Sequence, residues 1–99
     1  MSKCPMMIKH LDILIKGKIQ RVFFRASTKA VADQLGIKGT IKNEAGGDVS
    51  IQAEGDKIAL DLFIDWCHEG PQDAIVISVE SNEGEVKNYR NFEIVKKSL

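Results

Sequence analysis

The chain has few of the residues that mark metal-binding or disulfide-bonded proteins. Its two cysteines, Cys4 and Cys67, are far apart, and no further Cys or His follows either one at the spacing of a zinc site. Its two histidines, His10 and His68, are isolated in the same way. The sequence therefore predicts no metal site and two free thiols in a reducing compartment.

Long apolar runs and an excess of charge of one sign are also missing. No segment approaches the roughly 18 apolar residues that a transmembrane helix needs, and the N-terminal MSKCPMMIKH lacks the apolar run and cleavage site of a secretory signal. Because 14 basic residues balance 14 acidic ones, no overall positive field attracts nucleic acid or an anionic membrane. We therefore expect a cytoplasmic protein without nucleic-acid or membrane partners, in which any anion binding is local.

The composition that is present is that of an ordinary globular protein. Hydrophobic residues make up 43% and charged residues 28% of the 99 residues, a length that suits one modest core. Only two prolines occur, and no Ser/Pro-rich linker interrupts the chain. We predict a single domain over residues 1–99, with its core at about residues 8–95.

Strict alternation of apolar and polar residues predicts a first strand over residues 8–16. Its apolar side holds Leu11, Ile13 and Ile15, and its polar side holds His10, Asp12 and Lys16. Short β-prone stretches predict further strands at 37–43, 49–55, 74–81 and 92–95. A Gly-containing turn at 44–48 joins the second and third strands into a hairpin.

Apolar residues at helical spacing predict two helices, at residues 24–35 and from the capping residue Asp56 to about 68–71. The first helix is expected to pack through Phe24, Ser27, Val31 and Leu35, with Ala26 and Ala30 beside this stripe. The second is expected to pack through the ridge of Ile58, Leu62 and Trp66 and the adjacent ridge of Ala59 and Phe63. Cys67 is predicted to be a packed thiol and not a nucleophile.

The order of these elements predicts an α+β fold, the β-α-β-β-α-β arrangement of ferredoxin-like α/β sandwiches. Two helices, each with one apolar face, can cover one face of a four-stranded, mostly antiparallel sheet and leave the other face partly wet. A short C-terminal strand is added. This fold hosts many unrelated activities, so the function must be argued from a site.

The junction between the first strand and the first helix, GKIQRVFFR at residues 17–25, is a candidate anion site. The first backbone N–H groups of a helix lack partners and carry the positive end of its dipole. Arg25, in the first turn, can bring a planar fork of donors to the same anion. It can equally extend into solvent or pair with a carboxylate, and its position in the sequence does not decide between these roles.

Asn43, at the end of the strand 37–43, is the second candidate. An Asn ahead of Gly46 and Gly47 is a common turn-forming residue. As an amide it can also orient a water molecule, because it donates and accepts hydrogen bonds at once. Both interpretations remain open from the residue alone.

Several blocks of the sequence together resemble the acylphosphatase family over about residues 10–95. They are GKIQRVFFR, AVADQLGIKGTIKN, GGDVSIQAEG, GPQDA and the terminal FEI, in this order. The resemblance implies hydrolysis of the carboxyl-phosphate bond of acylphosphates, without metal or cofactor, on a ferredoxin-like fold. It implies a small acylphosphate substrate and phosphate as partners, and we expect a monomer.

The resemblance also implies roles for individual residues. Arg25 matches the arginine that binds the phosphoryl group, and Asn43 matches the amide that positions the attacking water. By the same resemblance, backbone N–H groups of Gln20, Arg21, Val22, Phe23, Phe24 and Arg25 are expected to form the phosphate-binding loop.

Within the proposed loop, one position departs from the family pattern, because Gln20-Arg21-Val22 stands where the family usually has Gln-Gly-Val. If this position requires positive φ, a residue other than glycine is strained there by roughly 1–3 kcal/mol. Either Arg21 adopts an ordinary conformation or the loop is distorted and activity is impaired. The alternative function is therefore a non-catalytic phosphate-binding regulatory module. A ferredoxin-like RNA binder is disfavoured, since the predicted strands lack exposed aromatic residues.

Overall fold

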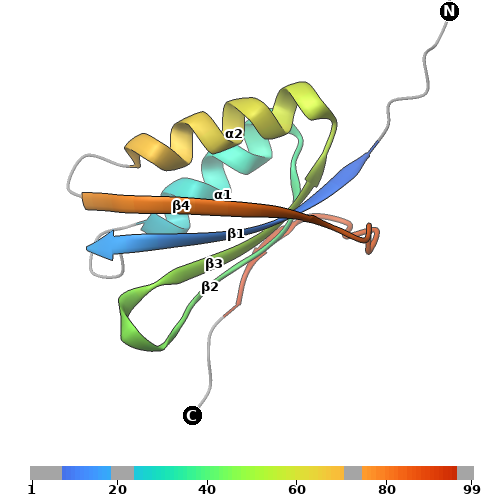
Figure 1. Ribbon diagram of the computed structural model, residues 1–99. Helices are drawn as coiled ribbons and strands as arrows, with labels where there is room; N and C mark the ends of the chain where they lie inside the picture. The colour runs from blue at the N-terminus through green and yellow to red at the C-terminus, as the bar shows by residue number, and fades with distance from the viewer. Residues whose placement is uncertain (1–7, 19–23, 71–74, 96–99) are drawn as a thin grey trace, which may run out of the picture.

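The computed structural model describes residues 8–18, 24–70 and 75–95, and Figure 1 shows the arrangement of the elements. In chain order these are β1 (Lys9–Lys18), α1 (Phe24–Leu35), β2 (Lys38–Asn43), the short 3₁₀ turn η1 (Ala45–Gly47), β3 (Val49–Gly55), α2 (Lys57–Glu69), β4 (Ile75–Gly84) and β5 (Phe92–Ile94). The predicted helices and strands are confirmed, with shifts of a few residues at their ends.

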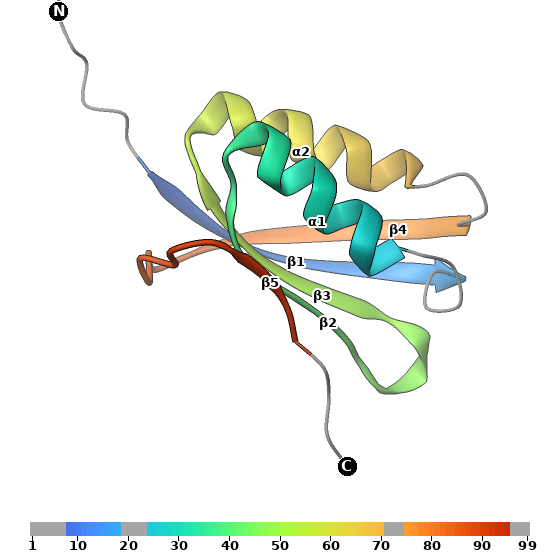
Figure 2. The same ribbon diagram turned by 180° about the vertical axis from the view of Figure 1, so that it is seen from behind.

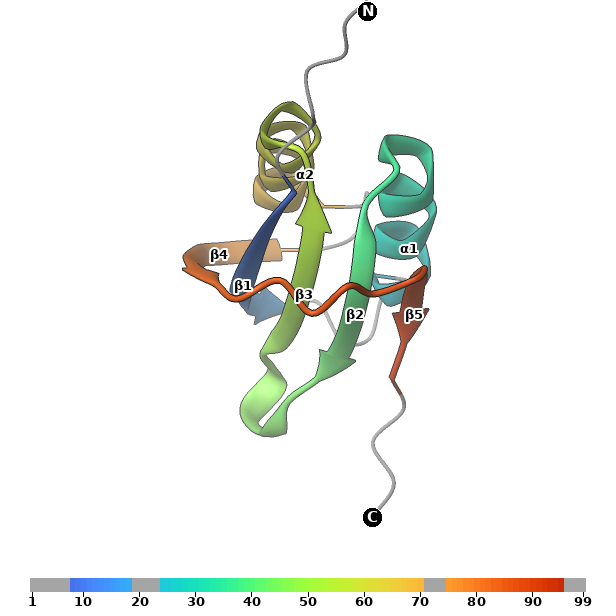
Figure 3. The ribbon, with the colours of Figure 1, turned by 90° about the vertical axis from the view of Figure 1, so that its right-hand side faces the viewer.

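The described strands form one sheet in the order β4-β1-β3-β2-β5. All neighbours are antiparallel except β2 and β5, which run parallel. Both helices lie on the same face of this sheet (Figures 1 and 3). The α+β, ferredoxin-like prediction is confirmed, and the short C-terminal strand extends the sheet beside β2.

The core lies between the sheet and the two helices. Alternate residues of β1 and β3 face the helices, as the alternating pattern of β1 predicted, and large apolar side chains of both helices close the layer. The fully or nearly fully buried hydrophobic residues are Ile13, Ile15, Phe24, Ala32, Ile37, Ile41, Val49, Ile51, Ala53, Leu60, Phe63, Cys67 and Phe92. Burying a large apolar side chain contributes about 1.5–3 kcal/mol, so this layer is the main stabilising feature.

Helix α1 packs through a different stripe from the predicted one. Phe24, Thr28 and Ala32 are buried, whereas Val31 and Leu35 are only partly buried and Ala26 and Ala30 are exposed. Thr28 can enter the interior because its hydroxyl donates to the Phe24 carbonyl at 2.7 Å. A satisfied hydroxyl adds little cost, so a polar residue takes a place that hydropathy alone assigns to an apolar one.

Helix α2 also differs from the prediction. In the predicted ridge of Ile58, Leu62 and Trp66, only Trp66 packs against the core, whereas Ile58 and Leu62 are 74% and 50% exposed. The adjacent ridge of Ala59 and Phe63 packs against the core as predicted, and the buried residues of the helix are Leu60, Phe63 and Cys67. These three share the side that faces the sheet, and at 3.6 residues per turn Ile58 and Leu62 fall on the opposite side. The predicted cap is confirmed, since the Asp56 carboxylate accepts the Ala59 N–H at 2.8 Å.

The connection from β4 to β5, residues 85–91, crosses the sheet face opposite the helices, and we call it the crossover segment (Figure 3). It explains why His10, predicted on the wet side of β1, is only 1% exposed. The Tyr89 ring stacks on its imidazole with centroids 6.4 Å apart. The sequence pattern places His10 on the correct side of β1, but local alternation does not show that a distant segment covers this side.

A bulge between β1 and β4 depends on Gly17. The register of the two strands shifts between Lys16 and Gly17, where φ is +149° and an added Cβ would lie 1.9 Å from the Ile75 carbonyl oxygen. We expect Gly17→Ala to lower the free energy of unfolding by at least about 3 kcal/mol, because unfavourable φ and a backbone clash combine. Denaturant unfolding measures the loss.

Gly46→Ala is the matched control for this prediction. Gly46 also has positive φ, +87°, but an added Cβ would meet nothing within 4 Å. It should cost only about 1–2 kcal/mol, the conformational term alone. Equal losses in the two variants would contradict the close approach at Gly17.

The Cys67 thiol is buried in α2 and free. Burial raises its pKa to about 12, so the thiol stays protonated at and well above neutral pH, and the thiolate that reacts with disulfide reagents is not formed. In a Cys4→Ser variant we expect thiol modification at pH 8 only as fast as the protein unfolds. Rapid, denaturant-independent modification would contradict this.

Candidate active site

The end of β1, the start of α1 and the turn between β2 and β3 lie at the same end of the sheet (Figure 2). The strand register places Asn43 opposite Val49, and Val49 opposite Ile15. Because directly opposed residues point to the same face, all three lie on the face that carries the helices. The carboxyl end of β2 and the amino end of α1 therefore border the same region.

The start of α1 is fixed by the buried Phe24. Its ring is 1% exposed and packs against Trp66 of α2, with ring centroids 5.7 Å apart. Arg25 follows in the first turn and is partly buried. The ion pairs found among the described residues do not include Arg25. None of the carboxylates in these ion pairs is therefore a partner of Arg25.

Asn43 presents a hydrogen-bond acceptor that the described residues leave unused. Its Oδ1 is buried and has no hydrogen-bond partner among them. A buried carbonyl without a partner costs about 1–3 kcal/mol, which a bound water or ligand donor can offset. Buried unsatisfied groups are uncommon in folded proteins, and functional sites are one of the places where they occur.

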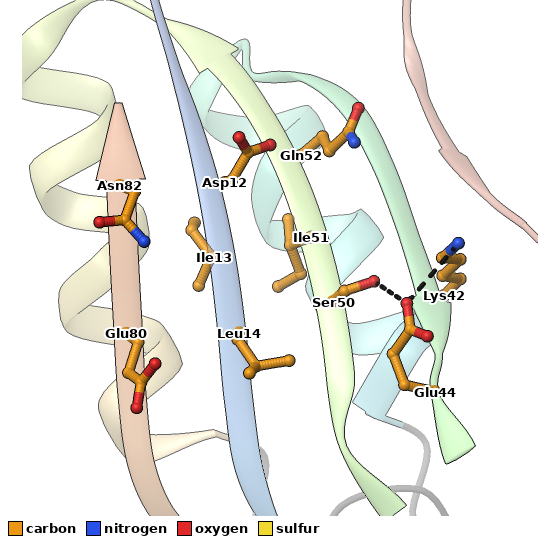
Figure 4. A pocket seen from close by; sticks show the side chains of 10 residues that line it. All are labelled: Asp12, Ile13, Leu14, Lys42, Glu44, Ser50, Ile51, Gln52, Glu80 and Asn82. Carbon is orange, nitrogen blue, oxygen red and sulfur yellow. Dashed lines mark hydrogen bonds and ion pairs between the residues drawn. The ribbon is translucent and has the colours of Figure 1, made fainter. Parts of the chain in front are cut away.

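The β2–β3 turn holds Asn43 in place. The Glu44 N–H donates to the Asp48 carbonyl at 2.7 Å, and the Glu44 carboxylate accepts from the Ser50 hydroxyl at 2.6 Å and pairs with Lys42 at 3.6 Å (Figure 4). Gly46 supplies the positive φ inside the turn. The predicted turn at 44–48 is confirmed, and its bonds fix the residue that directly follows Asn43.

Part of the predicted phosphate-binding loop lies outside the described residues. Gln20, Arg21, Val22 and Phe23 belong to this part, whereas Phe24 and Arg25 are described at the start of α1. The backbone cradle and the effect of Arg21 therefore stay predictions.

A shallow groove of about 380 Å³ lies on the face opposite the helices, and Figure 4 shows the side chains that line it. They are Asp12, Ile13, Leu14, Lys42, Glu44, Ser50, Ile51, Gln52, Glu80 and Asn82. Asn43 points to the other face, so the groove is separate from the candidate site.

Within residues 8–18, 24–70 and 75–95, no group of three or more His, Cys, Asp or Glu is arranged to hold a metal ion. No helix in these ranges is long and apolar enough to cross a membrane.

Comparison with known proteins decides the family. The model of the acylphosphatase family matches residues 11–94, nearly the whole chain and both candidate residues. The chain belongs to the acylphosphatase family. Membership supports assignment of the chain as an acylphosphatase-type hydrolase. The family name implies hydrolysis of acylphosphates.

Individual acylphosphatases match over most of their own length. The acylphosphatase of Archaeoglobus fulgidus is 43% identical over 84 residues, which cover 85% of this chain and 94% of that protein. The acylphosphatase of Marinobacter nauticus is 42% identical over 78 residues, covering 79% and 85%. The structure of the Coxiella burnetii acylphosphatase superposes with a TM-score of 0.86 at 33% identity, covering 89% of this chain and 93% of that one.

Proposed function

We propose that this acylphosphatase family member hydrolyses acylphosphates to a carboxylate and inorganic phosphate by direct attack of water, with Arg25 and Asn43 as its catalytic residues. The observation that carries this proposal is the buried, unpartnered Oδ1 of Asn43 at the same end of the sheet as the α1 N-terminus. The Asn43 side chain can accept a hydrogen bond from a water molecule, and the positive end of the α1 dipole can attract a phosphate group.

The phosphoryl group is bound by backbone and side-chain donors. N–H groups of the loop from Gln20 to Arg25 surround its oxygens, and the guanidinium of Arg25 adds two parallel charge-assisted bonds. Phosphoryl transfer has a loose transition state with charge on the equatorial oxygens, so catalysis needs positioning and charge compensation more than covalent chemistry. These groups supply both.

The attacking water is oriented by the Asn43 amide. The water oxygen forms a bond to phosphorus while the bond from phosphorus to the acyl oxygen breaks, and the electron pair leaves with the carboxylate. The proton of the water goes to a phosphate oxygen of the substrate. Because a carboxylate is a stable leaving group, no acid is needed to protonate it.

Arg21 supports the second candidate, a phosphate-binding module without turnover, because it stands where the family usually has glycine. Benzoyl phosphate hydrolysis and calorimetric titration with inorganic phosphate separate the two. Turnover supports the enzyme. Phosphate binding with no turnover above the uncatalysed rate supports the module and overturns the proposed activity.

We further propose that the protein works as a cytoplasmic monomer. The free buried thiol of Cys67 supports a reducing compartment. Light scattering coupled to size-exclusion chromatography gives the oligomeric state, and a dimer at micromolar concentration contradicts it.

A further inference from the structure

A buried ion pair lies on the sheet face opposite the helices and belongs to no part of the proposed reaction. His10 of β1 and Glu54 of β3 are 1% and 3% exposed, and the His10 Nδ1 lies 2.7 Å from Glu54 Oε2. The other ring nitrogen, Nε2, lies 3.0 Å from the Asp12 carboxylate. Two acceptors therefore face the two ring nitrogens, and only the imidazolium form donates to both.

The same Glu54 carboxylate holds the crossover segment. One oxygen accepts the Lys87 N–H in addition to the His10 contact, and the other accepts the Tyr89 N–H at 3.1 Å. The Tyr89 hydroxyl donates to the Gln52 side chain in β3. A buried charge with three donors is a well-satisfied anchor, whereas the same group without them is costly.

The crossover segment leads directly into β5. The Asn91 carbonyl accepts the Gly39 N–H at 3.0 Å, and the Val95 N–H donates to the Ile41 carbonyl at 2.8 Å. Between these bonds Phe92 is buried, with its ring edge-to-face on Phe63 at 6.1 Å between centroids. Docking of β5 on β2 thus follows from the path that the crossover segment takes.

We propose that the His10–Glu54 ion pair is an acid-labile clasp that holds the crossover segment across the sheet and thereby keeps β5 docked on β2. Protonation of Glu54 removes the ion pair and one acceptor, and leaves a buried imidazolium with Asp12 as its remaining partner. The other charged groups around the pair are Lys38, opposite Glu54 in β2, and Lys87 of the crossover segment, both exposed, while Gly84 of β4 lies opposite His10.

The direction of the pH dependence follows from Glu54. Burial by itself raises the pKa of this carboxyl, but hydrogen bonds from Lys87, His10 and Tyr89 and the charge of His10 together lower it below its ordinary value of 4.5. A carboxyl with a lowered pKa in the folded state contributes its full stabilisation above that ordinary value. The contribution is lost as the pH falls from there through the lowered pKa, so the clasp opens in acid.

Native-state hydrogen exchange tests the clasp in the unmodified protein. The amides of Gly39 and Val95 report β5 docking, and amides shared between β1 and β3 report the intact core. From neutral pH down to about pH 3, we expect protection of the two reporter amides to fall at least about tenfold while the core amides stay protected. Unchanged reporter protection, or simultaneous loss at all amides, contradicts the clasp.

Two variants sharpen the test. Glu54→Gln keeps the size of the side chain but cannot ionise, so the reporter amides should lose protection at neutral pH and show no further response to acid. Glu85→Gln removes an exposed carboxylate from the same crossover segment and should titrate like the wild type. If Glu54→Gln keeps wild-type protection and its acid response, the ion pair is not the clasp. The wild-type titration decides the outcome if this variant does not fold.

Discussion

We expect Arg25→Ala to lower kcat/KM for benzoyl phosphate by at least about 10³-fold, the range found when a transition-state donor to a phosphoryl group is lost. Arg25 lies in the first turn of α1, and the start of α1 lies at the same end of the sheet as the β2–β3 turn (Figure 2). None of the ion pairs among the described residues involves it. The variant should therefore lose activity with little loss of stability. Steady-state kinetics and denaturant unfolding measure the two effects.

Two controls separate the geometry of Arg25 from its charge. Arg25→Lys keeps the charge but loses the planar fork, so most of the activity should still be lost. Lys29→Ala removes a charge from the same helix. Because Lys29 pairs with Asp33 at 2.9 Å on the surface, this variant should keep kcat/KM within about twofold of the wild type. Similar kcat/KM values for Arg25→Ala and Lys29→Ala would rule out Arg25 as the phosphate ligand.

Asn43→Ala is expected to lower kcat by at least about 10²-fold with little change in KM, because a group that orients the attacking water acts on the chemical step. Stability should not fall. The Oδ1 of Asn43 is buried without a partner among the described residues, so its removal also removes a polar group whose burial costs about 1–3 kcal/mol. Activity lost while stability is kept or gained is a pattern that a purely structural residue does not give.

Asn82→Ala is the matched control for Asn43. Asn82 lies exposed on β4, on the face without helices, and its replacement should change neither kcat nor stability. A higher KM with unchanged kcat in Asn43→Ala would assign this residue to substrate binding. A loss of more than about 1 kcal/mol of stability would assign it to the turn instead.

The element order was predictable because each strand and helix carries its own local pattern. Which side of each helix is buried was not predictable, because it depends on how the helix lies on the sheet. Thr28 is buried through a hydrogen bond to Phe24 that hydropathy does not register. Ile58 and Leu62 are apolar yet point away from the sheet.

Long-range features were likewise beyond the sequence pattern. The parallel pairing of β5 with β2 and the burial of His10 both follow from the path of the crossover segment. Glu54 gave no local signal, because a polar residue in an alternating strand predicts a wet position. A histidine and a carboxylate separated by 44 residues in the chain become partners only through strand register.

The candidate site was predictable to a different degree at each residue. Arg25 and Asn43 were proposed from motif resemblance, and the fold brings the elements that carry them to one end of the sheet. The unpartnered Oδ1 of Asn43 had no sequence signal, because backbone and turn geometry determine which polar atoms are left without partners. The roles of both residues, and of the loop from Gln20 to Phe23, remain predictions that kinetics must test.

Hydrolysis of benzoyl phosphate in ¹⁸O-labelled water tests the central claim most directly. If water oriented by Asn43 attacks phosphorus, enzymatic turnover must place one labelled oxygen in inorganic phosphate and none in benzoate. Label in benzoate would mean that the carbonyl carbon is attacked, and the absence of turnover above the uncatalysed rate would mean that the protein only binds phosphate. Either result contradicts the proposed mechanism.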